Sequence, residues 1–163
     1  NGTPQKVKCQ EAIFDYEKDY ETNGNLYTWE EASTLCPQGW RLPTDEDWQQ
    51  LEMALGMSAK EANEEGWRGE HVATLLKEGN DGLGMNLQLS GCAWQSGSYG
   101  FTIYLTNINE FGYFWTATEK KDSGLSVQTV YFRKIFATYS TVYRYTSPLD
   151  ILMRVRCVRN AQQ

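Results

Sequence analysis

The sequence predicts a single α+β domain, with short helices in its first half and antiparallel strands in its second half. Helix-initiating pairs, in which a carboxylate residue follows a Ser or Thr by three positions, recur between residues 28 and 61. From residue 79 onward, short β-branched and aromatic runs alternate with Gly, Ser and Asn, at the spacing of about 8 to 12 residues typical of antiparallel sheet. Helices that precede strands, instead of alternating with them, indicate an α+β arrangement. A length of 163 residues suits one domain with a hydrophobic core.

The first two helices are predicted by the same chemistry at their N-termini. Thr28 with Glu31, and Thr44 with Asp47, have the spacing of a capping box. In this motif the hydroxyl accepts a hydrogen bond from the third backbone N–H, and the carboxylate accepts one from the cap residue's own N–H. We therefore expect helices that begin at residues 29 and 45.

A third pair, Ser58 with Glu61, predicts a short helix that ends near residue 65, and residues 70–77 predict one or two further helical turns. The segment 39–43 is too short and too aromatic for a free loop, so we expect a brief extended segment with Trp40 and Leu42 directed inward. The tryptophans assigned to the core are Trp40, Trp48, Trp67 and Trp115.

The second half is expected to form the sheet, with Arg133, Arg154 and Arg156 at outward or edge positions. Residues 1–25 are expected to form an N-terminal arm with one strand near residues 12–16, and residues 26–163 to form the single domain. The other expected strands lie at residues 87–89, 101–105, 113–118, 127–136, 142–145 and 151–158.

The net charge of −6 is unevenly distributed along the chain. Residues 1–81 carry a net charge of −10, and residues 82–163 carry +4. An acidic total disfavours nucleic acid as a partner, because such binding is driven by neutralisation of phosphates. The uneven distribution predicts that basic C-terminal strands lie against acidic N-terminal helices; a functional anion site on the basic half is the alternative.

Four motifs together resemble one protein family. They are the strings CPQGWRLPTDEDWQQLE at 36–52, GWRG at 66–69, GYFWTATE at 112–119 and VRCVR at 155–159. In this order they resemble the Fibrobacter succinogenes major paralogous domain family, over residues 26–160. The resemblance implies a C-type-lectin-like fold, a group that includes the formylglycine-generating enzymes. In such a fold, short N-terminal helices pack on twisted antiparallel β-sheets with long loops.

The four cysteines, Cys9, Cys36, Cys92 and Cys157, allow three pairings of two disulfides. No Cys-x-x-Cys pair is present, which argues against a zinc knuckle or a thioredoxin-like redox site. Cys36 and Cys157 both lie on inward stripes, and the resemblance implies a bridge from the first helix to the last strand, so we predict Cys36–Cys157. A Cys9–Cys92 bond is the further candidate, with buried free thiols as the alternative.

No catalytic residue, metal ligand set or cofactor is predicted. His71 is the single histidine, so a Ser-His-Asp triad could use only this residue, and a histidine-rich metal site lacks a second histidine. The sugar-binding calcium motifs of C-type lectins are absent, as is the pair of closely spaced cysteines near the C-terminus of formylglycine-generating enzymes. What remains is calcium-independent binding, with a carboxylate-based enzyme in a groove between the loops as an alternative.

We therefore expect a non-catalytic module that binds a glycan, a peptide or a surface protein, or alternatively a structural component of a cell-surface assembly. Rings in a Gly-, Ser- and Thr-rich context can stack on a ligand, and arginines can donate to a carboxylate or sulfate. For Arg133, an ion pair with the acidic half is the alternative. The candidate ligand-binding residues are Trp94, Tyr99, Tyr104, Arg133, Tyr143, Arg144 and Tyr145.

The location expected from the sequence is extracellular or at the cell surface, with the periplasm as an alternative. An even number of cysteines favours an oxidising compartment. No run of about 18 apolar residues is present, so no membrane-spanning segment is expected. Because the sequence begins at Asn1, we expect a mature or trimmed chain whose leader, with or without a lipid anchor, has been removed.

Overall fold

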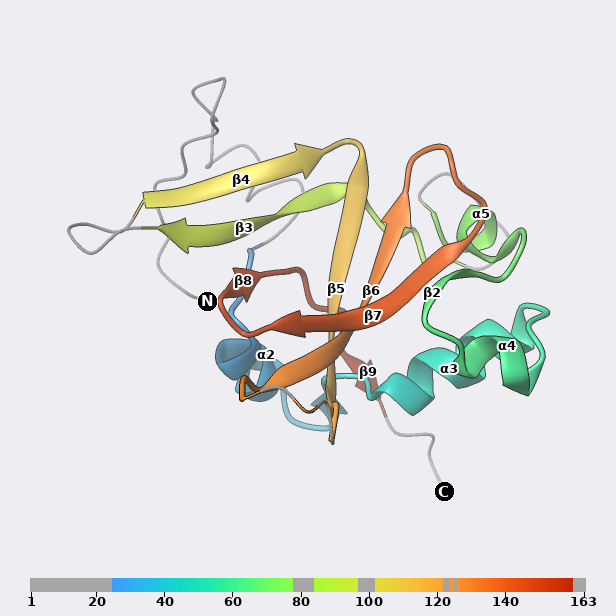
Figure 1. Ribbon diagram of the computed structural model, residues 1–163, viewed down its shortest axis with the longest axis horizontal. Coiled ribbons are helices and arrows are strands. Elements are labelled where there is room, and N and C mark those ends of the chain that lie inside the picture. Colours follow the sequence, from blue (N-terminus) through green and yellow to red (C-terminus); the bar gives the residue numbers. More distant parts are fainter. Residues whose placement is uncertain (1–24, 78–83, 97–101, 122–123, 125, 160–163) are drawn as a thin grey trace.

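The computed structural model has the predicted α+β arrangement of short helices and a predominant sheet (Figure 1). It describes residues 25–77, 84–96, 102–121, 124 and 126–159, with the backbone only at 95–96 and 102–105. The helices are α2 (Trp29–Leu35), α3 (Asp45–Ala54), α4 (Ala59–Asn63) and α5 (Val72–Leu76). The strands are β1 (Trp40–Arg41), β2 (Gly66–Arg68), β3 (Ser90–Ser96), β4 (Thr102–Ile108), β5 (Phe111–Glu119), β6 (Thr129–Phe136), β7 (Val142–Pro148), β8 (Ile151–Leu152) and β9 (Val158–Arg159). The strand expected near residues 12–16 lies outside the described residues.

The capping boxes that predicted α2 and α3 are both present. At the start of α3, Asp47 N donates to Thr44 Oγ1 over 3.1 Å, and Thr44 N donates to an Asp47 carboxylate oxygen over 2.7 Å. At α4, Ser58 Oγ accepts from Glu61 N as predicted, but the Glu61 carboxylate accepts from Gly69 N over 3.1 Å. Glu61 thereby ties α4 to the turn that follows β2.

The main sheet has seven strands, in the order β2-β7-β6-β5-β3-β4, with β8 paired to β3. Its pairs are antiparallel except for β3 and β5, which are parallel where Gly91 faces Gly112. Gly91 has a φ of 68°, and a Cβ atom there would lie 2.2 Å from the carbonyl oxygen of Thr106 in β4. Strand β3 was not predicted; the strand expected at 87–89 is reduced to an isolated bridge of Leu87 with Lys77.

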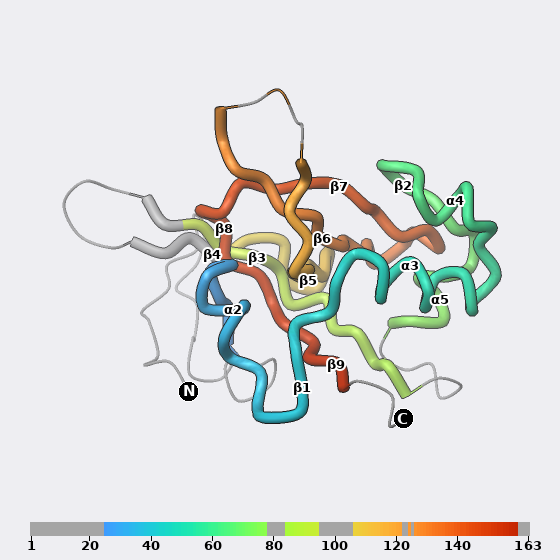
Figure 2. Tube along the Cα trace, turned by 90° about the horizontal axis from the view of Figure 1, so that it is seen from below, coloured from blue at the N-terminus to red at the C-terminus, as the bar shows by residue number. Residues whose placement is uncertain are grey.

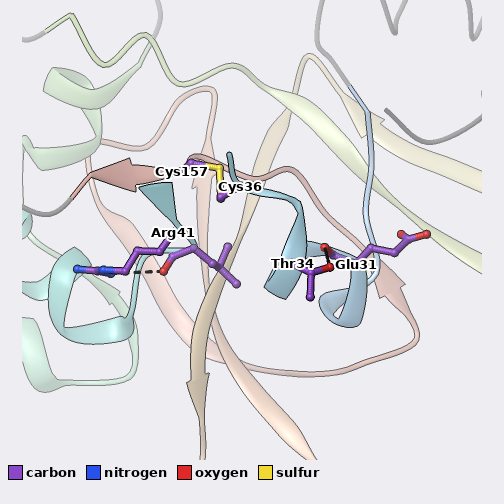
Figure 3. Close-up of a disulfide and its surroundings, with 6 residues drawn as sticks. Glu31, Thr34, Cys36, Arg41 and Cys157 are labelled. Carbon is purple, nitrogen blue, oxygen red and sulfur yellow. Dashed lines mark hydrogen bonds between the residues drawn. A yellow bond between two sulfur atoms is a disulfide. The ribbon is translucent and has the colours of Figure 1, made fainter. Parts of the chain in front are cut away.

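The first and last parts of the domain are joined by a strand pair and a disulfide, besides a bridge between Tyr27 and Met153. Strand β1 pairs with β9 through Trp40 and Arg159, and Cys36 is bonded to Cys157 as predicted (Figures 2 and 3). The assignment of Trp40 to the core is wrong: its side chain is 45% exposed, and the Arg159 guanidinium lies 5.7 Å from its ring centroid. The neighbouring Leu42 is buried as expected.

The sheet carries a hydrophobic cluster on each face, because side chains alternate along its strands. On one face, Trp48 of α3 and residues of α5 pack with Phe114 and Ile135. On the other face, Ala32 of α2 packs with Trp115 and neighbouring side chains of β6. Accordingly, α3, α4 and α5 lie together at one end of the molecule and α2 lies toward the other (Figures 1 and 2). No helix in the described parts of the chain combines the length and the apolarity that crossing a membrane requires.

Candidate binding surface

The two faces of strands β5, β6 and β7 have different chemistry where the strands pair most regularly. Residue pairs that lie opposite each other across these strands share a face. Phe114, Arg133 and Arg144 form one such cross-strand row, directed toward α3. One residue further along, Tyr113, Lys134 and Tyr143 form a row on the opposite face, which Trp67 of β2 extends.

The arginine row is buried against carboxylates of α3. Asp45 Oδ1 accepts from Arg133 Nη1 over 2.6 Å, and Asp45 Oδ2 accepts from Arg144 Nη2 over 2.7 Å. Glu52 accepts from Arg133 Nε over 2.9 Å and also pairs with Arg68. The expected ion pair between the acidic helices and the basic strands is therefore confirmed for Arg133.

The placement of the arginines corrects several expectations. Arg133 and Arg154 were expected at outward or edge positions, and Arg133 and Arg144 on the ligand-binding surface. The guanidiniums of Arg133 and Arg144 are enclosed, that of Arg133 completely. Arg154 is also buried, and its Nη2 donates to the carbonyl oxygen of Ser90, whereas Arg156 is exposed. Paired carboxylates and carbonyl oxygens compensate for the loss of water around a guanidinium, which allows these charges to be interior.

The pKa values reflect this balance of burial and pairing. Burial raises the pKa of Asp45, but the hydrogen bonds and charges of Arg144 and Arg133 outweigh burial and hold the pKa below its ordinary value. Burial lowers the pKa of the Arg68 guanidinium to about 10, even though the charge of Glu52 opposes this change. The cluster thus pairs two carboxylates with three guanidiniums in the interior of the described chain.

The other face carries a closed circuit of seven aromatic side chains, which we call the aromatic face. Each ring contacts the next, with centroid separations from 4.4 Å for Phe111 and Phe136 to 6.3 Å for Tyr113 and Phe132. In order around the circuit the rings are Trp67, Tyr139, Phe136, Phe111, Tyr113, Phe132 and Tyr143. Tyr145 extends the face beside Tyr143, at 6.0 Å.

Most of these rings remain open to solvent. Tyr139 and Tyr145 are 47% and 45% exposed, and the others are half-buried, except for Phe132, which is buried. The turn that carries Tyr139 is fixed by Lys77, whose Nζ donates to the carbonyl oxygens of Ala137 and Tyr139 over 3.1 and 2.6 Å. Within the described residues, no partner binds the hydroxyls of Tyr139, Tyr143 and Tyr145. The face therefore offers flat apolar surfaces beside hydroxyl groups.

The predicted ligand-binding residues divide between several places. Tyr143 and Tyr145 lie side by side on the aromatic face. Trp94 lies half-buried in β3, opposite Tyr104 of β4 and Ile151 of β8. Tyr99 lies outside the described residues, and for Tyr104 only the backbone is described.

Most of the aromatic face was missed by reasoning from the sequence. Trp67 was assigned to the core, and the residues not considered as site residues are Phe111, Tyr113, Phe132, Lys134, Phe136 and Tyr139. The sequence did contain a signal for this face, because side chains two positions apart lie on the same side of a strand. Residues 111 and 113 therefore share one side of β5, and residues 132, 134 and 136 share one side of β6. Aromatic residues repeat at that period in three consecutive strands, which predicts a shared ring-rich face.

Cys92 lies near this face as a buried free thiol, one of the two alternatives left open for it, and Cys9 lies outside the described residues. Burial raises the pKa of Cys92 to about 11, so the thiol is neutral at pH 7. The described residues hold no group of three or more His, Cys, Asp or Glu that fits a metal ion. His71 is exposed beside Glu70, 3.8 Å from its carboxylate.

The comparisons with known proteins identify the family. The sequence profile of the Fibrobacter succinogenes major domain matches residues 3–159, nearly the whole chain. The search of curated proteins and the search of solved structures each gave no match. The profile covers all four motifs from which the resemblance was inferred, and the chain belongs to the Fibrobacter succinogenes major domain family.

Proposed function

We propose that this protein is an exported, non-catalytic recognition module that binds a carbohydrate on its aromatic face without calcium. The observation that carries the proposal is the closed circuit of partly exposed rings on one side of β5, β6, β7 and β2. A sugar ring has C–H groups on its faces and hydroxyls at its edge. Aromatic rings with adjoining hydroxyls complement both parts, since tyrosine is apolar at one end and hydrogen-bonding at the other.

The rings are also preorganised, which favours binding. Tyr143 and Phe132 are held within β7 and β6, and Lys77 fixes the turn of Tyr139 through two hydrogen bonds. A side chain that is already ordered loses little conformational entropy when a ligand binds. An aromatic surface whose rings are already ordered favours a saccharide over a peptide that must itself become ordered.

The state of the buried carboxylates supports a non-catalytic role over a carboxylate-based enzyme. An acid catalyst requires a raised pKa in a cleft. Among the described residues the buried acids are Asp45 and Glu52, both paired with arginines, and the pKa of Asp45 is lowered. These carboxylates pair with buried arginines and stabilise the interior of the fold.

Two further parts of the proposal concern fold group and location. A C-type-lectin-like fold is supported by capped helices near the start of the domain, by the pairing of β1 with β9 and by the Cys36–Cys157 bond. Export, to the cell surface, the extracellular space or the periplasm, is supported by that same disulfide, because such bonds persist in oxidising compartments.

Binding to an array of immobilised neutral and acidic glycans tests the proposal. Tyr145→Ala and Tyr139→Ala remove the most exposed rings of the face, and each is expected to weaken binding about tenfold, the effect of losing a well-packed interface aromatic. Trp40→Ala is the matched control, because this ring is equally exposed but lies outside the aromatic face. An array without signal, or equal losses for Trp40→Ala and Tyr145→Ala, would refute carbohydrate binding there. Selective peptide binding, or self-association in light scattering, would assign the face to a protein partner instead.

A further inference from the structure

Among the described residues, Lys134 is the one cation that lies within the circuit of rings. Its backbone is paired between Tyr113 of β5 and Tyr143 of β7, so its side chain emerges on the aromatic face. The ammonium lies 4.2 Å from the ring centroid of Tyr143, and four rings lie within 6 Å of it. The distances to the other three are 5.4 Å for Phe111, 5.5 Å for Trp67 and 5.9 Å for Tyr113.

The rings satisfy only part of what an ammonium group requires. Ring faces attract the charge, but an ammonium also has three N–H donors that need acceptors. In the described parts of the chain, no carboxylate pairs with Lys134 and no oxygen accepts a hydrogen bond from its Nζ. The neighbouring thiol of Cys92 is neutral at pH 7 and supplies no counter-charge.

Lys134 differs in this respect from two other lysines near the same sheet. Lys120 also lies over two tyrosine rings, but its Nζ is 2.5 Å from a carboxylate oxygen of Glu65. Lys77 donates to two backbone carbonyl oxygens. Among these three, Lys134 alone has its donors available within the described structure, at the centre of the rings proposed to bind a ligand.

We infer that Lys134 is an anion subsite of the aromatic face, and that the ligand is a saccharide bearing a carboxylate or a sulfate group. This inference rests on the proposed function, and it names the class of sugar. An anionic oxygen at Nζ receives a charge-assisted hydrogen bond in a partly desolvated place, where such bonds are stronger than in water. The sugar ring that carries the anion then stacks on the adjacent rings.

Short saccharides suit this site, because the chain as a whole has a net charge of −6 and repels a highly charged polymer. Calorimetric titration with trigalacturonate, a sulfated galactotriose and neutral galactotriose distinguishes a carboxylate, a sulfate and an uncharged ligand. The wild-type protein is expected to bind at least one acidic trisaccharide about tenfold more tightly than the neutral one, the effect of one hydrogen bond to a charged group.

Lys134→Met keeps the apolar stem against the rings and removes the charge. It is expected to lower the affinity for the acidic trisaccharide about tenfold, to that of the neutral one, without changing the neutral affinity. Lys134→Arg retains the charge and should retain the preference for the acid. Lys60→Met removes an equal charge at an exposed position in α4 and should leave all affinities unchanged. Circular dichroism and the urea midpoint verify that each variant folds.

Several results would overturn the anion subsite. If acidic and neutral trisaccharides bind equally, the subsite is wrong and carbohydrate recognition by the rings stands. If Lys134→Met weakens binding of the acidic and the neutral trisaccharide equally, the lysine positions the rings and does not bind the anionic group. If acidic binding persists unchanged in Tyr145→Ala and Tyr139→Ala, the aromatic face itself is refuted, and if no trisaccharide binds, the inference fails altogether.

Discussion

Replacing Asp45 by Asn tests whether the buried charge cluster is held together by this carboxylate. Asp45 is 3% exposed and accepts hydrogen bonds from Arg133 and Arg144. The amide preserves the shape of the side chain but removes its charge, and it directs an NH2 group or a weaker acceptor at the guanidiniums. Arg68, Arg133 and Arg144 are then left with Glu52 as the one carboxylate of the cluster.

The expected loss of stability in Asp45→Asn is the attraction lost from two ion pairs minus the desolvation cost that the variant avoids. Each Asp45–arginine pair represents roughly 4 kcal/mol of attraction at an effective dielectric constant near 20. The variant no longer has to desolvate one carboxylate, which offsets several kcal/mol of the two lost attractions. We therefore expect the free energy of unfolding to fall by about 3 to 5 kcal/mol, the range for removing one member of a buried ion pair.

Urea denaturation at pH 7, followed by tryptophan fluorescence with the disulfide intact, measures this loss. Asp47→Asn is the control, because it makes the same change in the same turn of α3 at a side chain that is 27% exposed and pairs with Arg41. The asparagine oxygen can still accept from Thr44 N, so the capping box keeps its acceptor and the charge is what the variant removes. An exposed ion pair contributes at most about 1 kcal/mol. If Asp45→Asn costs no more than Asp47→Asn, the cluster does not depend on the Asp45 charge and the reasoning is refuted.

The pH dependence gives a second measurement of the same effect. The arginines hold the pKa of Asp45 below its ordinary value, whereas in the unfolded chain it titrates near 3.9. The contribution of Asp45 is therefore complete above about pH 4 and is lost as the pH falls through the lower, folded-state pKa. We expect the free energy of unfolding to fall less on acidification in Asp45→Asn than in the wild-type protein. If the free energy of unfolding falls equally with decreasing pH in the two proteins, the lowered pKa of Asp45 is contradicted.

Two further predictions concern the connections of the fold. Replacing Cys36 and Cys157 together by Ala, or reducing their bond, opens a link between residues 121 positions apart and should lower the free energy of unfolding by about 4 to 5 kcal/mol in the chain-entropy account; an unchanged urea midpoint under reduction would disprove this. Gly91→Ala should cost at least about 2 kcal/mol, because its Cβ would lie 2.2 Å from a carbonyl oxygen of β4. Gly39→Ala, also at positive φ but with no described atom within 4 Å, should cost about 1 kcal/mol, and equal midpoints for the two variants would remove the steric argument.

Local signals explain why the helices were predictable. Thr28 and Thr44 each lie three residues before the carboxylate that completes their capping box, so all the interacting groups fall within one turn. The strands β5 and β6 were likewise visible as runs of aromatic and β-branched residues. By contrast, β3 includes Gly91 and two serines and has little intrinsic strand propensity, so its pairing with three other strands defines it.

The candidate site was predicted only in part, because a ring's exposure depends on what the sheet places above it. Tyr143 and Tyr145 were identified from their context in the sequence. Trp67 and Trp40 were both assigned to the core, yet Trp67 joins the aromatic face and Trp40 lies exposed beside Arg159. Hydrophobicity favours burial of every such ring, and the limited interior decides which of them remain at the surface.

The sequence by itself determined the family, the capped helices, the α+β order and the Cys36–Cys157 pair, because each depends on a local pattern or a shared motif. The tertiary structure alone decided which side of the sheet each charge occupies. Arg133 is interior because Asp45 and Glu52, 88 and 81 positions away, accept its hydrogen bonds. The next residue, Lys134, faces the rings, since successive side chains in a strand point to opposite faces. Whether a charge can be buried depends on partners that only folding brings together.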